Sequence, residues 1–223
     1  MIYNGDGTSP TDFQALASLI KSHGLTYQAV TSAELNSMSL AKLTSFGTYV
    51  WPGGDSNVMD ASLTAGTKKL VRQAVTESGV GFAGFCAGAW IAVGPAPGSA
   101  NAGWGFSILT GSYLKEYAPG GQYPVAAIVP VTLASGGTRD LVWWGGPYLP
   151  TIAGGVVGKY PDGTAAIVQS RAGAGYVAIT GLHPEAPQDW RTAQNLVDRD
   201  GLDLDIAWNI IQAARTRAPM PAF

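Results

Sequence analysis

Cys86, the only cysteine of the chain, lies in segment 84–89 (GFCAGA), between an apolar run and a stretch of small residues. This pattern is typical of a strand-to-helix turn that presents a nucleophile, because bulky neighbours would block both the strained backbone and the substrate. A thiol attacks as the thiolate, and its ordinary pKa of about 8.5 leaves little thiolate at neutral pH. A helix beginning at Ala87 would stabilise the thiolate with its unpaired N–H groups and dipole.

A histidine and a carboxylate follow much later, in segment 181–185 (GLHPE). If His183 folds beside Cys86, it would take the thiol proton and return it to a leaving amine. Glu185 would orient the imidazole and favour its protonated form. These residue types predict a Cys86-His183-Glu185 triad. The alternatives are a buried inert cysteine, a histidine that fixes the turn before Pro184, and a surface or helix-start carboxylate.

Attack on an amide or ester creates an oxyanion, which preorganised backbone N–H groups stabilise by roughly 3–4 kcal/mol. The N–H of Ala87 is one predicted donor. Gly53 or Gly54, in the turn at 52–54 (PGG), is predicted to supply the other. A turn without side chains lets the backbone come close to the substrate.

Other side chains are candidates for the substrate pocket. Asp6 follows the first predicted strand and is expected at the active edge, where it could touch Cys86 or the substrate; an Asx turn in its own loop is the alternative. Trp143, Trp144 and Tyr148 flank a Gly-Gly-Pro loop. Trp144 and Tyr148 are predicted to wall the pocket, with core packing as the alternative.

Strands and helices alternate through the first half of the chain. Such alternation implies right-handed crossovers and a mainly parallel sheet, with ligands outside the carboxyl ends of the strands. Cys86 and the glycine turn at 52–54 would then share one edge. Thr31 and Glu34 have the spacing of a capping box, and Gly24 can end the first helix. Strands are predicted at 2–3, 25–30, 47–51 and 80–85, and helices up to about residue 21, over 60–78 and from 87 onward.

The second half predicts antiparallel additions to this sheet, because its apolar runs are separated by turns rich in Gly, Pro and Asp. A strand at 176–180 leads to His183, and helical spacing over 204–214 predicts a closing helix. Residues 1–223 are therefore expected to form one α/β domain. The predicted additions are strands at 125–129, 141–144 and 164–168, with a hairpin at 159–164 and a turn at 172–175.

Composition excludes several classes of partner. A formal net charge of −2 and few charged residues leave no basic stripe for nucleic acid or an anionic membrane. No apolar segment approaches the roughly 18–20 residues that span a bilayer, so we expect a soluble protein that acts on a small-molecule amide or peptide. One cysteine forms no internal disulfide, so the compartment stays open between cytoplasmic and secreted with a trimmed signal segment.

No metal or cofactor is predicted. The two histidines and one cysteine are widely separated and lack the paired spacing of metal ligands. The glycine-rich segments do not match a phosphate loop, which argues against a nucleotide cofactor. His23 is assigned to the end of the first helix, where a cationic side chain complements the dipole.

The ordered motifs PGG at 52–54, GFCAG at 84–88 and HPE at 183–185 resemble the class I glutamine amidotransferase-like superfamily over nearly the whole chain. More narrowly, IYNGDG at 2–7, CAGAW at 86–90 and GGPY at 145–148 are similar to its biotin-protein ligase N-terminal-like branch. This resemblance implies a three-layer α/β/α sandwich with a flavodoxin-like sheet. It also implies a hydrolytic triad of Cys86, His183 and Glu185.

The resemblance implies a cysteine-dependent amidohydrolase that works through a thioester. Glutamine amidotransferases carry a glutamine four residues after the nucleophile, where this chain has Trp90, so the prediction is amide hydrolysis with Trp90 near the substrate. A transferase role would need a separate acceptor enzyme. Two alternatives stay open: a noncatalytic ligand-binding or scaffold domain, and a peptidase, chaperone or glyoxalase type in which Asp6 acts beside Cys86.

Overall fold

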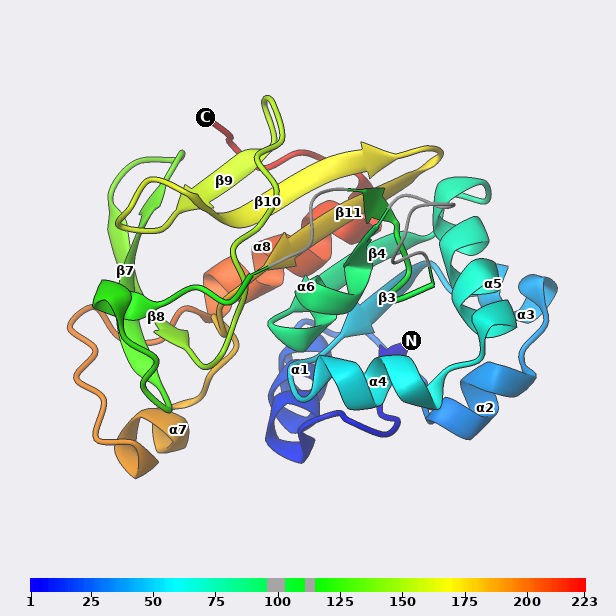
Figure 1. The fold of residues 1–223 in the computed structure, drawn as a ribbon, viewed down its shortest axis with the longest axis horizontal. Coiled ribbons are helices and arrows are strands. Elements are labelled where there is room, and N and C mark those ends of the chain that lie inside the picture. The colour runs from blue at the N-terminus through cyan, green and yellow to red at the C-terminus, as the bar shows by residue number, and fades with distance from the viewer. Residues whose placement is uncertain (96–102, 111–114) are drawn as a thin grey trace.

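The computed structural model describes residues 1–95, 103–110 and 115–223, and within them a mixed sheet of nine strands crosses the molecule (Figure 1). Its order is β2-β1-β3-β4-β11-β10-β9-β7-β8. The first five strands in this order are parallel: β2 (Ala29–Val30), β1 (Ile2–Tyr3), β3 (Thr48–Trp51), β4 (Gly81–Phe85) and β11 (Gly175–Thr180). The other four extend the sheet as antiparallel neighbours: β10 (Ala165–Ala172), β9 (Val156–Lys159), β7 (Ala127–Leu133) and β8 (Thr138–Trp143).

Helices cover both faces of the parallel half of the sheet (Figure 1). One face carries α1 (Pro10–Ser22) and α8 (Leu204–Thr216). The other carries α2 (Ser32–Ser37), α3 (Leu40–Thr44), α4 (Ser56–Ser62), α5 (Ala65–Thr76) and α6 (Ala87–Ala92). Beside the antiparallel end lies α7 (Gln188–Ala193), and the small elements are a parallel pair, β5 (Val93–Gly94) with β6 (Leu109–Thr110), and a 3-10 turn (Pro119–Gly121). No helix among the described residues has the length and apolar character needed to cross a bilayer.

Side chains of the central strands alternate between two hydrophobic clusters, one on each face of the sheet. Along β3, Tyr49 and Trp51 belong to the cluster under α5 and α6, whereas Val50 belongs to the cluster under α1 and α8. Successive side chains of a strand point to opposite faces, so a sheet covered on both faces buries every position. The expected three-layer α/β/α sandwich with a parallel core and antiparallel additions is confirmed.

Some ends of helices and strands agree with the prediction from sequence, and others do not. The capping box at α2 is present, with the N–H of Thr31 donating to Glu34 at 2.8 Å. The helix predicted over 60–78 is divided, because Thr64 caps a new helix by accepting the N–H of Thr67 at 3.0 Å. The strand predicted at 25–30 is shorter, since only its last two residues pair with β1.

Candidate active site

Cys86 sits in a strained turn between β4 and α6. Its backbone has φ 48° and ψ −106°, a conformation that non-glycine residues rarely adopt. The small residues around it are required, because a Cβ at Gly84 would clash with the carbonyl of Gly88, and a Cβ at Gly88 would clash with the carbonyl of Trp51. The turn therefore holds Cys86 at the N-terminus of α6, as the sequence predicted.

Strand β11 delivers His183 to the same edge as Cys86. Phe85 at the end of β4 pairs in register with Thr180 at the end of β11, and the N–H of Cys86 donates to the Thr180 carbonyl at 2.9 Å. The N–H of His183 then donates to the Val142 carbonyl at 2.8 Å, which ties the loop to β8. Cys86 and His183 thus each follow one of two neighbouring parallel strands.

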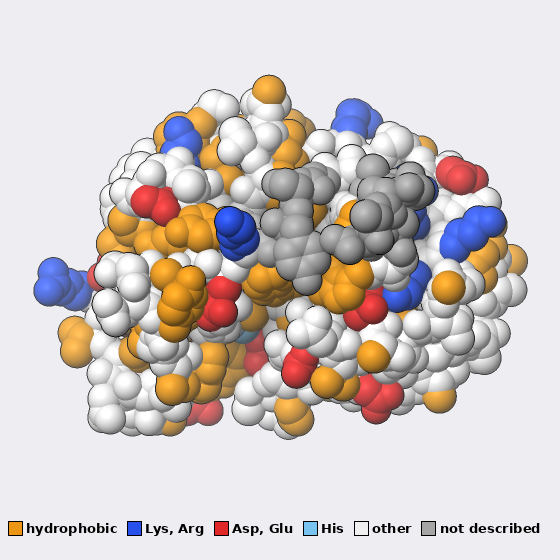
Figure 2. Space-filling model, viewed as in Figure 1, with side chains coloured by type: hydrophobic (Ala, Val, Ile, Leu, Met, Phe, Trp, Pro, Cys, Tyr) orange, Lys and Arg blue, Asp and Glu red, His pale blue; other side chains and the backbone are white. Residues whose placement is uncertain are grey.

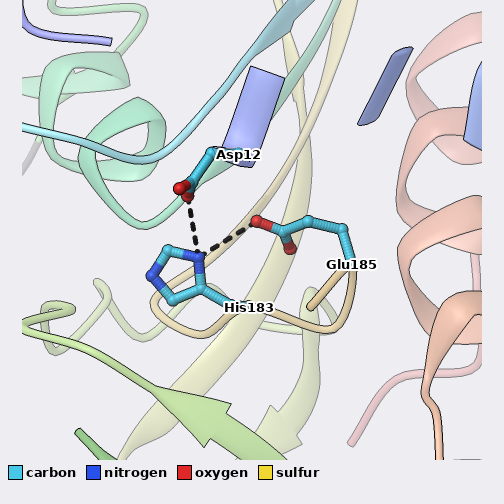
Figure 3. Close-up of side chains that lie close together, drawn as sticks. All are labelled: Asp12, His183 and Glu185. Carbon is cyan, nitrogen blue, oxygen red and sulfur yellow. Dashed lines mark hydrogen bonds and ion pairs between the residues drawn. The ribbon is translucent and has the colours of Figure 1, made fainter. Parts of the chain in front are cut away.

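Two carboxylates meet the same nitrogen of His183 (Figure 3). Nδ1 lies 3.0 Å from Oε1 of Glu185 and 3.1 Å from Oδ1 of Asp12. All three side chains are buried. Glu185 was predicted from the sequence, but Asp12 was not. The available signal was an acidic residue in the first turn of the helix after β1, which must start at the active edge.

The hydrogen-bond pattern leaves the reactive side of the imidazole open. Nδ1 lies at hydrogen-bond distance from Oε1 of Glu185, and because a carboxylate oxygen accepts, Nδ1 is the donor of this pair. Within the described part of the chain, Nε2 of His183, Oδ1 of Asp12 and Oε2 of Glu185 are buried without a hydrogen bond. Nε2 points away from both carboxylates (Figure 3). It is therefore free to exchange a proton with a thiol or a bound substrate.

Charge around His183 favours the imidazolium. Burial alone would lower the pKa of His183, but negative charge on Cys86, Glu185 and Asp12 outweighs it and raises the pKa well above the usual 6.5. Burial raises the pKa of the Glu185 carboxyl above 4.5, and the attraction of His183 partly offsets that rise. A cationic ring beside Cys86 is the electrostatic condition that a thiolate needs.

Cys86 and His183 line a cavity of about 640 Å³, which we call the histidine-side cavity. Cys86 also lines a second cavity of about 400 Å³, the Trp90-side cavity. Figure 2 shows this face of the molecule hollowed between the side that carries α7 and β8 and the side that carries α4. The Sγ of Cys86 donates to the Trp144 carbonyl at 3.4 Å, so in this state the thiol is held by backbone.

The predicted oxyanion-hole residues have different surroundings. Ala87 is the first residue of α6, where an N–H has no intrahelical acceptor. Gly54 has φ +139° and lines both cavities with Cys86. Gly53 has a further role, because a Cβ there would clash with the carboxylate of Asp12 and the ring of His183.

Two of the aromatic candidates line a cavity, and the third, Tyr148, is half-buried against other aromatic rings. Trp144 is 38% exposed and lines the histidine-side cavity. Trp90 lines the Trp90-side cavity and donates its Nε1–H to the Gly145 carbonyl at 3.4 Å. Tyr148 lines neither cavity; its ring packs against the rings of Tyr117 and Tyr160, with centroids 5.3 and 6.0 Å away.

Asp6 and His23 lie outside the site. Asp6 is exposed and lines neither cavity, and its backbone N–H donates to Ser32 at 2.8 Å. The alternative that requires Asp6 beside Cys86 therefore lacks its geometric basis. His23 ends α1 and stacks on Trp208 with ring centroids 3.7 Å apart, which agrees with the structural role expected for it.

Among the residues that the structure describes, two groups of side chains have the ligand types and proximity of a metal site. Asp12, His183 and Glu185 place their ligand atoms within 4.8 Å of one another, and so do Asp140, Asp198 and Asp200. In the first group, the separations of 3.0 and 3.1 Å are those of hydrogen-bonded pairs. In the second group, two of the three carboxylates form ion pairs: Asp198 pairs with Arg191, and Asp200 pairs with Arg139.

Comparison with known proteins gives a fold. No family model and no curated protein matches the sequence. Among solved structures, one described as a glutamine amidotransferase is 20% identical, with a TM-score of 0.59 over 93% of this chain and all of its own. PurLQS from Thermotoga maritima is 15% identical, with a TM-score of 0.59 over 94% of this chain and 95% of the matched chain.

A structure described as a GMP synthase protein from Thermoplasma acidophilum is 13% identical, with a TM-score of 0.56 over 97% of this chain and 96% of its own. The chain has the fold of these amidotransferase-type structures. At such identities the likeness concerns backbone arrangement, so function has to be argued from the site itself.

Proposed function

We propose that this protein is a cysteine-dependent amidohydrolase of the class I glutamine amidotransferase-like superfamily, nearest to its biotin-protein ligase N-terminal-like branch. One observation carries the proposal. Cys86, in a strained turn at a helix N-terminus, lines the same cavity as His183, whose Nδ1 is held by buried carboxylates. This combination of nucleophile, base and orienting acid is the arrangement of covalent acyl transfer.

In the proposed reaction the Cys86 thiolate attacks the carbonyl carbon of an amide. The oxyanion accepts hydrogen bonds from the N–H groups of Ala87 and the turn at Gly53 and Gly54. The C–N bond breaks as protonated His183 gives its Nε2 proton to the departing amine, which leaves a thioester on Cys86. His183 then takes a proton from water as the hydroxide bonds to the thioester carbon; the C–S bond breaks, the carboxylic acid leaves, and the Cys86 thiolate is restored beside protonated His183.

Glutamine is not proposed as the substrate, because Trp90 occupies the position at which the amidotransferase pattern carries a glutamine. Trp90 lines the Trp90-side cavity, where a substrate's acyl part would lie. The proposed substrate class is therefore a small amide or peptide. Transfer of the amine to a separate acceptor enzyme would extend the same chemistry.

A noncatalytic ligand-binding protein is the second candidate. It is favoured by the thiol's hydrogen bond to the Trp144 carbonyl and by the absence, within the described residues, of any hydrogen bond at Nε2 of His183. Apo sites often tighten only when substrate binds, so this geometry does not outweigh the triad.

Two measurements separate the candidates. Screening amides and short peptides for amine release should give turnover that Cys86→Ala removes by at least about 10³-fold. Iodoacetamide should label Cys86 in the folded protein, and His183→Ala should slow the labelling. Cys86 that reacts only after denaturation, together with no amine release, would refute the enzyme and leave the binding protein.

A further inference from the structure

The two cavities that Cys86 lines share Gly54 and differ in their other side chains. The histidine-side cavity contains His183, and the Trp90-side cavity does not. Gly54 and Cys86 line both, so a carbonyl attacked by the thiolate would lie at their junction. A substrate must therefore extend one part into each cavity.

Proton transfer decides which part goes where. The departing nitrogen must come within hydrogen-bond reach of Nε2 of His183 when the C–N bond breaks. The amine consequently leaves through the histidine-side cavity, and the acyl part lies toward Trp90. This assignment rests on the proposed function.

The histidine-side cavity is far larger than ammonia requires. Its volume is about 640 Å³, within the range of roughly 300–1,000 Å³ found for sites of drug-sized ligands. Trp144 and Trp190 form its aromatic wall, with centroids 6.4 Å apart at 83°, and Ala193 adds apolar surface. The Trp190 ring also meets the imidazole of His183 edge-on at 5.6 Å. A group attached to the amine would contact this wall as it departs.

Charge restricts that group further. The carboxylates of Asp12 and Asp189 line the cavity, and within the described lining no lysine or arginine is present. Asp189 is exposed in the first turn of α7, so it stands at the rim. Because Asp12 pairs with the His183 ring, the unpaired charge is that of Asp189 at the rim, which a carboxylate on the amine would meet and a neutral or cationic amine would tolerate.

We propose that the substrate is an N-substituted amide whose leaving amine carries an apolar, preferably aromatic, group and no carboxylate. Primary carboxamides, which release ammonia, would leave this cavity unfilled.

Matched electrophiles test the cavity without requiring turnover. Chloroacetamide and N-benzylchloroacetamide alkylate a thiolate in the same way: sulfur bonds to the methylene carbon and chloride departs. Alkylation of Cys86 is followed by intact-protein mass spectrometry, and each rate is divided by the rate for the urea-unfolded protein. The benzyl compound should react at least about tenfold faster in the folded protein, because its ring is buried against the tryptophans.

Substitutions in the cavity wall identify the side chains that cause the faster reaction of the benzyl compound. Trp144→Ala should remove most of it, and Trp190→Phe, which keeps a ring in the buried position, should weaken it. Trp208→Ala, a remote aromatic substitution beside His23, should leave it unchanged. A 4-carboxybenzyl compound should react about threefold more slowly than the benzyl compound at low salt, and Asp189→Asn should relieve that difference.

Hydrolysis of paired amides completes the test. With one acyl group, the benzylamide should exceed the primary amide in kcat/KM by at least about tenfold. A normalised preference below threefold, or equal hydrolysis of the two amides, overturns the inference while the proposed function stands. A benzyl preference with no hydrolysis of any amide refutes the proposed function, and the assignment of the cavity to a leaving group falls with it.

Discussion

Two carboxylates share Nδ1 of His183, yet that nitrogen carries one hydrogen. Glu185 is fully buried and lies in hydrogen-bond contact with Nδ1 at 3.0 Å, whereas Asp12 approaches at 3.1 Å as a second negative charge. Glu185 therefore fixes the tautomer and orientation of the ring, and Asp12 adds to the stabilisation of the imidazolium. Substitution of Glu185 should therefore reduce activity more than substitution of Asp12.

Glu185→Gln is expected to lower amide hydrolysis by at least about 100-fold, and Asp12→Asn by less than about tenfold. Both should lower the pKa of His183, because each removes negative charge beside the ring. Nuclear magnetic resonance titration of the His183 ring protons measures this pKa. Asp6→Asn is the control and should change neither quantity. Equal losses of activity would show that Asp12 orients the ring as much as Glu185 does.

Stability should depend on pH through His183. Its folded pKa is raised above the unfolded value of about 6.5, so its contribution is fully present below pH 6.5 and is lost as pH rises through the folded pKa. The difference in unfolding free energy between wild type and His183→Asn should fall with rising pH above 6.5, by at most about 1.4 kcal/mol per unit. Urea denaturation between pH 5.5 and about 9 measures it. A constant difference would contradict the shift.

At the scale of elements, three glycines let the site assemble. Gly88 allows α6 to approach the Trp51 carbonyl, Gly84 leaves room for the Gly88 carbonyl, and Gly53 leaves room for Asp12 and His183. The obstacle is backbone in the first two cases and side-chain tips in the third. Substitutions should therefore affect stability at Gly88 and geometry of the site at Gly53.

Gly88→Ala is expected to destabilise the fold by about 1–3 kcal/mol, because backbone must shift to admit the methyl group. Gly53→Ala should reduce amide hydrolysis and His183-dependent labelling more than it reduces stability. Gly66→Ala in α5 is the matched control, since its nearest neighbour would be Thr64 at 3.7 Å. It should be neutral or stabilising. Thermal unfolding and the labelling rate read out the two effects, and similar stability for all three variants would refute the packing argument.

At the scale of the whole molecule, a buried arginine holds the chain segment that completes the cavity. Arg191 in α7 pairs with Asp198 and, at 3.0 Å, with Asp203 just before α8. It also donates to the Ala186 carbonyl at 2.6 Å. Arg191 thereby ties the loop after His183 to the closing helix, and it fixes Trp190 beside the histidine-side cavity.

Arg191→Met is expected to cost roughly 3–5 kcal/mol, because it removes the arginine that pairs with the buried carboxylate of Asp198 and leaves Asp203 paired with Arg139 alone. The loss should be accompanied by faster hydrogen exchange across 186–203 and by a smaller benzyl preference. Arg215→Met is the control, since Arg215 is exposed and bonds only Gln212 among the described residues. Urea unfolding and hydrogen exchange measure both variants. A loss below about 1 kcal/mol would show that the pairs add little.

Several local features of the structure were predictable from the sequence. The capping box at Thr31 and Glu34, the turn at Cys86 and the strand before His183 depend on neighbours in the chain, and each was predicted. The break in the helix expected over 60–78 was missed, although Thr64 with Thr67 has capping spacing. The prediction used the spacing of apolar residues, which does not reveal a polar residue that caps a new helix.

Sequence by itself determined the alternation of strands and helices and the small residues of the turn at Cys86. It also determined that a thiol, an imidazole and a carboxylate are present, because these features depend on local sterics and residue chemistry. Only the tertiary structure placed Asp12 beside His183, packed the half-buried Tyr148 against other aromatic rings, left Asp6 outside the site and made Cys86 part of the lining of two cavities. Those outcomes depend on packing between segments far apart in the chain, which no local pattern records.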